Sequence, residues 1–117
     1  MAEKLFAAQA PQELRSRFTT QMQAVGADGL VAALTAMRDR PDRTALLPTL
    51  GELPTLIVVG REDRITPPED SRAMADAVPG ATLVVVEGAG HLSPAEQPAR
   101  VNEALQTFLE EVARKGV

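Results

Sequence analysis

Two residues at the ends of apolar stretches have side chains suited to acid–base chemistry. His91 is the only histidine and ends the stretch "VVVEGAGH", and Asp63 lies in "GREDRITPP", directly after "TLIVV". A carboxylate that accepts a hydrogen bond from one imidazole nitrogen fixes the ring's tautomer and stabilises its cation. The other ring nitrogen is then free to take a proton from a nucleophile. We therefore predict that Asp63 and His91 are hydrogen-bonded to each other.

The residues alone leave other interpretations of these loops open. His91 could be a loop histidine held by a backbone carbonyl, and Glu62 stands beside Asp63 and could take its place. Gly88 and Gly90 favour a positioned imidazole, because glycines at such spacing suit a bend with positive φ or a close backbone approach. Ser93 could be proposed as a nucleophile, but proline follows it at once, so we expect a structural hydroxyl.

The glycines near His91 also invite comparison with the dinucleotide-binding fingerprint G-x-G-x-x-G. Ser93 stands where that pattern requires glycine or alanine, and Pro94 follows it. One histidine and no cysteine leave too few ligands for an ordinary zinc site. The sequence therefore predicts no cofactor and no metal.

Strand and helix patterns alternate in the second half of the chain. Residues 55–60 and 81–88 are short apolar runs bounded by proline or glycine, typical of strands covered on both faces. Helices are predicted from Pro67 to about Val78 and from Pro98 to about Lys115. This order predicts a parallel, right-handed β-α-β-α unit. The loops after both strands would then open on the same edge, where ligands bind in open α/β sheets.

The two predicted helices of this unit each have an expected inner face. The first is formed by Ala73, Met74 and Ala77, and the second by Val101, Leu105, Phe108, Leu109 and Val112.

Two further helices are predicted before this unit. Residues 11–26 place Leu14, Phe18, Met22 and Val25 on one stripe, and Gly26 suits the position just after a helix. A second helix begins near Asp28 and ends before Pro41, with Leu30, Val31, Leu34 and Met37 as its apolar residues. A proline-punctuated connector follows, with one helical turn expected after Asp42.

The composition limits the class of protein. The chain has 117 residues, a net charge of −4 and no basic stripe, which argues against a nucleic-acid partner. No apolar run approaches the length that crosses a membrane. Residues 1–10 lack the apolar core of a signal peptide, so a cytoplasmic protein is expected.

Residues 54–109 resemble the C-terminal segment of the α/β-hydrolase superfamily, most closely its esterase and enol-lactonase-like branch. The resemblance implies a Ser-Asp-His order of catalytic residues. It implies that the acid lies in a G-x-x-D turn, here Gly60 to Asp63, which favours Asp63 over Glu62. It implies that the base lies in a G-x-G-H loop, here Gly88 to His91. Residues 11–50 resemble the end of a helical lid and its return to the sheet.

The chain departs from this family in one respect. The nucleophile elbow G-x-S-x-G is absent, and none of Ser16, Ser71 and Ser93 has its surroundings. The resemblance therefore implies the last part of an ester or lactone hydrolase, carrying acid and base but no nucleophile, with little activity expected alone. A subunit of a split hydrolase completed by a partner chain, or a non-catalytic assembly or binding module, are the alternatives.

The expected architecture is one domain over residues 1–117. Residues 1–50 form a helical, lid-like segment with its connector, and residues 51–117 form the β-α-β-α unit of a partial α/β-hydrolase fold. Two parallel strands leave sheet edge and apolar surface uncovered, which invites pairing with another chain. We therefore expect a homo-oligomer, formed through the sheet edge or the N-terminal helices, with a monomer as the alternative.

Overall fold

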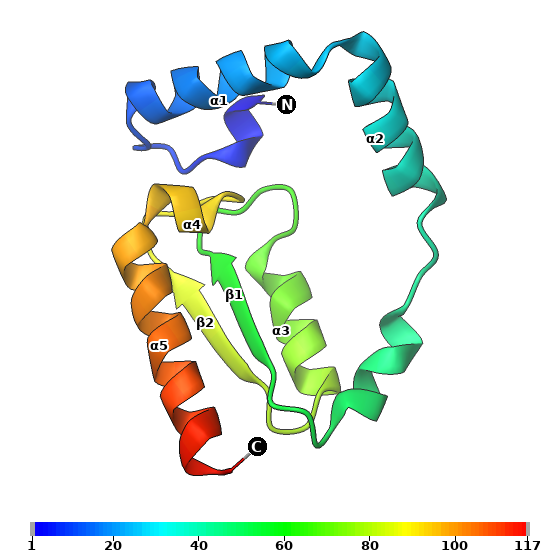
Figure 1. The fold of residues 1–117 in the computed structure, drawn as a ribbon, viewed down its shortest axis with the longest axis vertical. Helices are drawn as coiled ribbons and strands as arrows, with labels where there is room; N and C mark the ends of the chain where they lie inside the picture. Colours follow the sequence, from blue (N-terminus) through cyan, green and yellow to red (C-terminus); the bar gives the residue numbers. More distant parts are fainter. Residues whose placement is uncertain (1, 117) are drawn as a thin grey trace.

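A two-stranded parallel sheet forms the centre of the molecule in the computed structural model, which describes residues 2–116 (Figure 1). Strand β1 (Leu56–Gly60) pairs with β2 (Thr82–Val86), so that Leu56 lies opposite Thr82 and Gly60 opposite Val86. Helix α3 (Pro68–Ala77) connects the two strands, and α5 (Pro98–Arg114) follows β2. The predicted parallel β-α-β-α unit is therefore confirmed.

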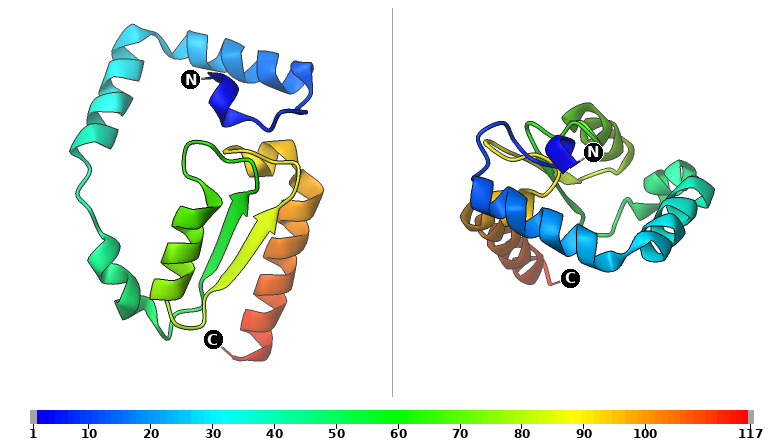
Figure 2. Two further views of the ribbon diagram at one scale, coloured as in Figure 1. Left: turned by 180° about the vertical axis from the view of Figure 1, so that it is seen from behind. Right: turned by 90° about the horizontal axis from the view of Figure 1, so that it is seen from above.

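The two long helices of this unit pack on opposite faces of the sheet (Figure 2). Val86, Ala89 and Val101 form a buried cluster, against which the half-buried Val58 and Val84 pack. On α5, Val101 is buried as predicted, but Leu105 and Leu109 are 44% and 61% exposed. The sheet is too narrow to cover the whole apolar stripe of the helix, so that part of the prediction is wrong.

The buried face of α3 also differs from the prediction. Ala73 and Met74 are exposed and Ala77 is half-buried, whereas Ser71 and Val78 are buried. Residues three and four positions apart share a helix face, and the face that packs on the sheet includes the small polar Ser71. Counting apolar residues alone therefore selects the wrong side of this helix.

The first half of the chain forms an arch of helices beyond the sheet. It contains the 3₁₀ turns η1 (Ala2–Leu5) and η2 (Thr44–Leu50) and the helices α1 (Gln12–Val25) and α2 (Ala27–Asp39). Figure 1 shows α1 lying above the carboxyl ends of the strands and α2 standing to one side. Gly26, with a φ of 82°, joins these two helices.

The predicted helices and the predicted turn after Asp42 are present. The apolar stripe of α1 is partly covered, since Phe18 and Met22 are half-buried and Val25 is exposed, whereas the stripe of α2 is exposed. On α1 only Leu14 is buried, and on α2 no residue is buried. Two short helical elements have no counterpart among the predicted helices, η1 and α4 (Ser93–Glu96). No helix among residues 2–116 is long and apolar enough to cross a membrane.

Candidate active site

Asp63 and His91 come together at the carboxyl ends of the two strands. His91 Nδ1 lies 3.0 Å from Asp63 Oδ2 and 3.2 Å from Oδ1, so the predicted hydrogen bond is confirmed. Asp63 is 6% exposed, while the imidazole side chain is 34% exposed. With Nδ1 directed at the carboxylate, Nε2 has no hydrogen-bond partner among residues 2–116. This arrangement leaves Nε2 available for proton transfer.

The Asp63 carboxylate is held by its own loop. Oδ1 accepts hydrogen bonds from the backbone N–H groups of Ile65 and Thr66, both at 2.9 Å, and Oδ2 accepts from the Thr66 hydroxyl at 3.1 Å. Burial works to raise the pKa of Asp63, but the hydrogen bonds from Thr66, His91 and Ile65 outweigh it and the pKa is lowered. Asp63 therefore stays a carboxylate at neutral pH.

The loops that carry Asp63 and His91 are joined backbone to backbone. Arg61 N–H donates to the Val86 carbonyl and Glu62 N–H to the Ala89 carbonyl, both at 2.9 Å. A Cβ on Gly60 would collide with the carbonyl oxygens of Ala89 and Gly90. Only glycine at position 60 therefore allows the two backbones to come this close, and the contact between the strands continues into the loops.

Of the glycines around His91, one adopts a positive φ and the other allows a close backbone approach, as expected. Gly88 has a φ of 72°, in the left-handed region that favours glycine. Gly90 packs against the chain near the N-terminus, where a Cβ would lie 2.8 Å from Phe6 C and 2.9 Å from Ala7 N. His91 N–H in turn donates to the Leu5 carbonyl at 2.8 Å.

Residues 5–8, which we term the N-terminal strap, lie between α1 and the His91 loop (Figure 1). Phe6 and Ala7 are 2% and 1% exposed. Arg15 Nη2 donates to the carbonyls of Ala7 and Ala8, at 2.7 and 3.1 Å, and its guanidinium lies 5.5 Å from the Phe6 ring centre. Arg64 Nη2 donates to the Phe6 carbonyl at 3.4 Å. Charged side chains thus fix this strap through its backbone.

The other candidate residues do not join the hydrogen bonds of the Asp63–His91 pair. Glu62 Oε1 accepts a hydrogen bond from Ala8 N–H at 3.0 Å, so its carboxylate serves the strap. Ser93 is buried at the start of α4, and its carbonyl accepts from Gln97 N–H. Ser71 is buried on α3, and Ser16 lies exposed on α1 beside Gln12. Within residues 2–116, none of these serines is hydrogen-bonded to the His91 ring, whose partners are Asp63 and Thr66.

Two residues that the sequence analysis missed also hold the pair. Thr66 bonds Asp63 through its backbone and its hydroxyl, and that hydroxyl lies 3.4 Å from His91 Nδ1. Glu96 accepts hydrogen bonds from the backbone on both sides of His91. A sequence signal for Thr66 exists: it lies three residues after Asp63, and an aspartate in a turn commonly accepts hydrogen bonds from the backbone that follows it. No comparable sequence pattern marks Glu96.

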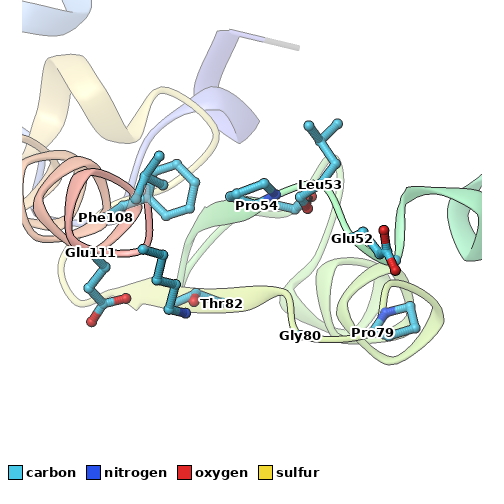
Figure 3. A pocket seen from close by; sticks show the side chains of 12 residues that line it. Glu52, Leu53, Pro54, Pro79, Gly80, Thr82, Phe108 and Glu111 are labelled. Carbon is cyan, nitrogen blue, oxygen red and sulfur yellow. Dashed lines mark hydrogen bonds between the residues drawn. The ribbon is translucent and has the colours of Figure 1, made fainter. Parts of the chain in front are cut away.

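The surface has a hollow near each end of the sheet. One of about 440 Å³ borders Asp63 and is lined by Arg61, Arg64 and Arg72 among others. Figure 3 shows another, of about 220 Å³, lined by Phe108, Leu53 and Thr82 at the amino ends of the strands. This second hollow has no histidine, serine or cysteine in its lining. Of these two hollows, the one at the carboxyl ends of the strands is therefore the one that borders Asp63.

Comparison with known proteins gives consistent matches along the chain. The family model of TAP-like proteins, an α/β-hydrolase family, matches residues 19–115. The epoxide hydrolase EphH of Mycobacterium tuberculosis is 37% identical over 76 residues, which are 59% of this chain and 36% of EphH.

Solved esterases match almost the whole chain. A thermophilic esterase from Thermogutta terrifontis, solved with malate bound, superimposes with a TM-score of 0.88 at 38% identity, over 96% of this chain and 42% of its own. The esterase EaEST from Exiguobacterium antarcticum gives a TM-score of 0.79 at 27% identity, over 93% of this chain and 40% of its own. The chain thus spans less than half the length of these relatives.

Proposed function

Because the chain belongs to the TAP-like family of α/β hydrolases, we propose that it supplies the acid and the base of a hydrolase that cleaves carboxylic esters or lactones. The observation that carries this proposal is the hydrogen bond between the buried Asp63 carboxylate and His91 Nδ1, at 3.0 Å. Asp63 orients the imidazole and stabilises its cation, and Nε2 takes the proton from a serine hydroxyl and returns it to the leaving group.

The serine and the oxyanion donors of such a reaction are not provided by these 117 residues, which lack G-x-S-x-G. We propose that a segment carrying this elbow completes the site next to His91 Nε2. Without it, His91 activates water at best, and general-base help of this kind contributes roughly 10²–10⁴ in rate. We therefore expect no measurable turnover of nitrophenyl esters by the 117-residue chain alone.

A chimera with the thermophilic esterase tests the assigned roles. The matching C-terminal part of that esterase, which superimposes over 96% of this chain, is replaced by residues 1–117, and hydrolysis of nitrophenyl acetate is measured. We expect activity that falls by roughly 10⁴ in kcat on Asp63→Asn or His91→Ala. The Asn amide would donate to Nδ1 and impose the tautomer in which Nε2 carries the proton.

Glu62→Gln is the matched control in the chimera, because Glu62 is the neighbouring carboxylate and bonds Ala8 rather than the imidazole. It should keep kcat within a few-fold of the unchanged chimera. An active chimera that tolerates His91→Ala would contradict the proposal. So would ester turnover by the 117-residue chain that disappears on the same substitution, because it would require a nucleophile within these residues.

The coding sequence upstream of Met1 separates the proposal from its alternatives. An in-frame G-x-S-x-G would support a single-chain hydrolase. The same motif in a neighbouring reading frame would support a split hydrolase completed by a partner chain. Its absence from both would support a non-catalytic assembly or binding module.

A further inference from the structure

The Glu96 carboxylate lies at the junction of the His91 loop and the N-terminal strap. Its Oε2 accepts hydrogen bonds from Gly90 N–H at 2.9 Å and from Leu92 N–H at 3.2 Å, the two residues that flank His91. Its Oε1 accepts from Ala7 N–H at 2.7 Å. One side chain therefore binds the backbone before and after the imidazole, together with a segment 89 residues away in the sequence.

The short helix α4 brings Glu96 back to the loop it follows. Ser93 to Glu96 form a single turn, in which the N–H groups of Ala95 and Glu96 donate to the Leu92 carbonyl. Pro94 restricts the backbone of this turn. The chain thus reverses direction within five residues of His91 and places the Glu96 carboxylate against the N–H groups of Gly90 and Leu92.

A carboxylate suits this position better than any neutral side chain. It has about four lone-pair sites and no donor, so both oxygens can accept backbone N–H groups at once. Hydrogen bonds to an ionised acceptor are roughly twice as strong as neutral ones. The Gln97 side chain adds one more contact to the loop, from its Nε2 to the Gly88 carbonyl at 3.3 Å.

We infer that Glu96 is a positioning residue, which holds the His91 backbone so that Nδ1 meets Asp63 and which ties this loop to the N-terminal strap. The inference rests on the proposed role of His91 as the base. Glu96 acts through the backbone N–H groups of Gly90 and Leu92, and it forms no hydrogen bond with the imidazole within residues 2–116. A substitution at Glu96 should therefore loosen the Asp63–His91 hydrogen bond without altering either partner.

The test uses the single histidine of the chain as a spectroscopic probe. In the 117-residue chain, ¹⁵N NMR of His91 reports which ring nitrogen carries the proton, and amide exchange reports the hydrogen bonds of Gly90, Leu92 and Ala7. In Glu96→Gln the amide NH₂ faces at least one of these N–H donors and cannot accept from it. We expect exchange at one or more of the three amides to be at least about tenfold faster. We also expect the Nδ1–H signal to broaden or move upfield.

Glu103→Gln is the matched control, because Glu103 is exposed on α5 and loses the same charge. It should leave the His91 signals and the three amides unchanged. If Glu96→Gln lowers the melting temperature while the His91 tautomer, its Nδ1–H signal and the three amides match those of the unsubstituted chain, Glu96 is merely structural and the inference is wrong.

The unsubstituted chain provides a second test if the variant does not fold. In the unsubstituted chain, the amides of Gly90, Leu92 and Ala7 should all be protected from hydrogen exchange. Their hydrogen bonds should open at similar rates, since one carboxylate holds all three. Exchange at the rate of an unstructured peptide would overturn the inference. Neither result depends on turnover, so an inactive chimera would remove the proposed function and leave the positioning of His91 to be judged by these signals.

Discussion

Asp63 rather than Glu62 faces the imidazole because of where each short loop directs its side chain. The Asp63 carboxylate folds back on Ile65 and Thr66, as an aspartate does in an Asx turn. The longer Glu62 side chain reaches Ala8 instead. From the residues alone the two carboxylates were equivalent, and only the family's G-x-x-D turn favoured Asp63. Which of the two carboxylates faces the imidazole depends on the backbone hydrogen bonds of the loop. Two adjacent acidic residues in a sequence give no information about those bonds.

Asp63→Asn should make the chain less sensitive to acid. The pKa of Asp63 is lowered from its ordinary value of 3.8, so its contribution to stability is present above that value and is lost as the pH falls through the lower, folded pKa. At pH 7 we expect the substitution to reduce the free energy of unfolding by about 1–3 kcal/mol, through weakened charge-assisted hydrogen bonds. The difference should shrink below about pH 4.

Urea unfolding followed by circular dichroism at pH 7, 5, 4 and 3 measures this effect. Asp76→Asn, at an exposed position on α3, controls for the general loss of an aspartate. A constant difference in free energy between Asp63→Asn and the unsubstituted chain over this pH range would show that the carboxylate's charge contributes nothing.

At the scale of the elements, the end of β1 and the loop after β2 act as one unit. Gly60 is the last residue of β1 and lies against the carbonyls of Ala89 and Gly90. Because Asp63 follows three residues later and His91 directly follows Gly90, this contact sets how far apart the acid and the base lie. Pairing between the strands fixes their register. The close backbone contact at Gly60 then fixes the position of the Asp63 loop relative to the His91 loop.

Gly60→Ala should therefore both destabilise the fold and separate the pair. The added methyl group collides with backbone atoms, which cannot turn aside as a flexible side chain can. We expect a loss of about 1–3 kcal/mol in the free energy of unfolding, as for other overpacked sites, and a change in the ¹⁵N signals of His91. Gly51→Ala is the control, because a Cβ there has ordinary contacts at 3.6 Å and the φ is −49°. Equal stability of the two variants would contradict this account of Gly60.

Sequence patterns predicted the elements far better than their packing. Strands and long helices follow from apolar runs, prolines and glycines, such as Pro98 at the start of α5 and Gly26 after α1. A carboxylate of the first loop was expected to meet His91 because both loops follow parallel strands, and only the family's G-x-x-D turn favoured Asp63 over Glu62. Helix α4 is a single turn and too short to show periodicity, so Glu96 and its three hydrogen bonds could not be foreseen. The strap depends on contacts between residues far apart in the chain, which no local pattern records.

At the scale of the whole molecule, much apolar surface stays uncovered. Within residues 2–116 the sheet has two strands, so an edge of each strand lacks a partner. Helix α2 has an apolar stripe formed by Leu30, Leu34 and Met37, which are 39%, 52% and 62% exposed. Contiguous apolar patches of this kind mark interaction sites or favour self-association.

We therefore expect the 117-residue chain to self-associate, with α2 contributing to the contact. Leu34 lies in the middle of the apolar stripe, so Leu34→Lys places a charge where association would have to desolvate it. Ala32→Lys adds the same charge on the opposite side of the same helix and keeps its helical propensity. Analytical ultracentrifugation should show a mass that rises with concentration for the unsubstituted chain and for Ala32→Lys, and a lower mass for Leu34→Lys. A monomeric mass for all three would contradict self-association, and association that Leu34→Lys leaves unchanged would move the contact from α2 to the sheet edge.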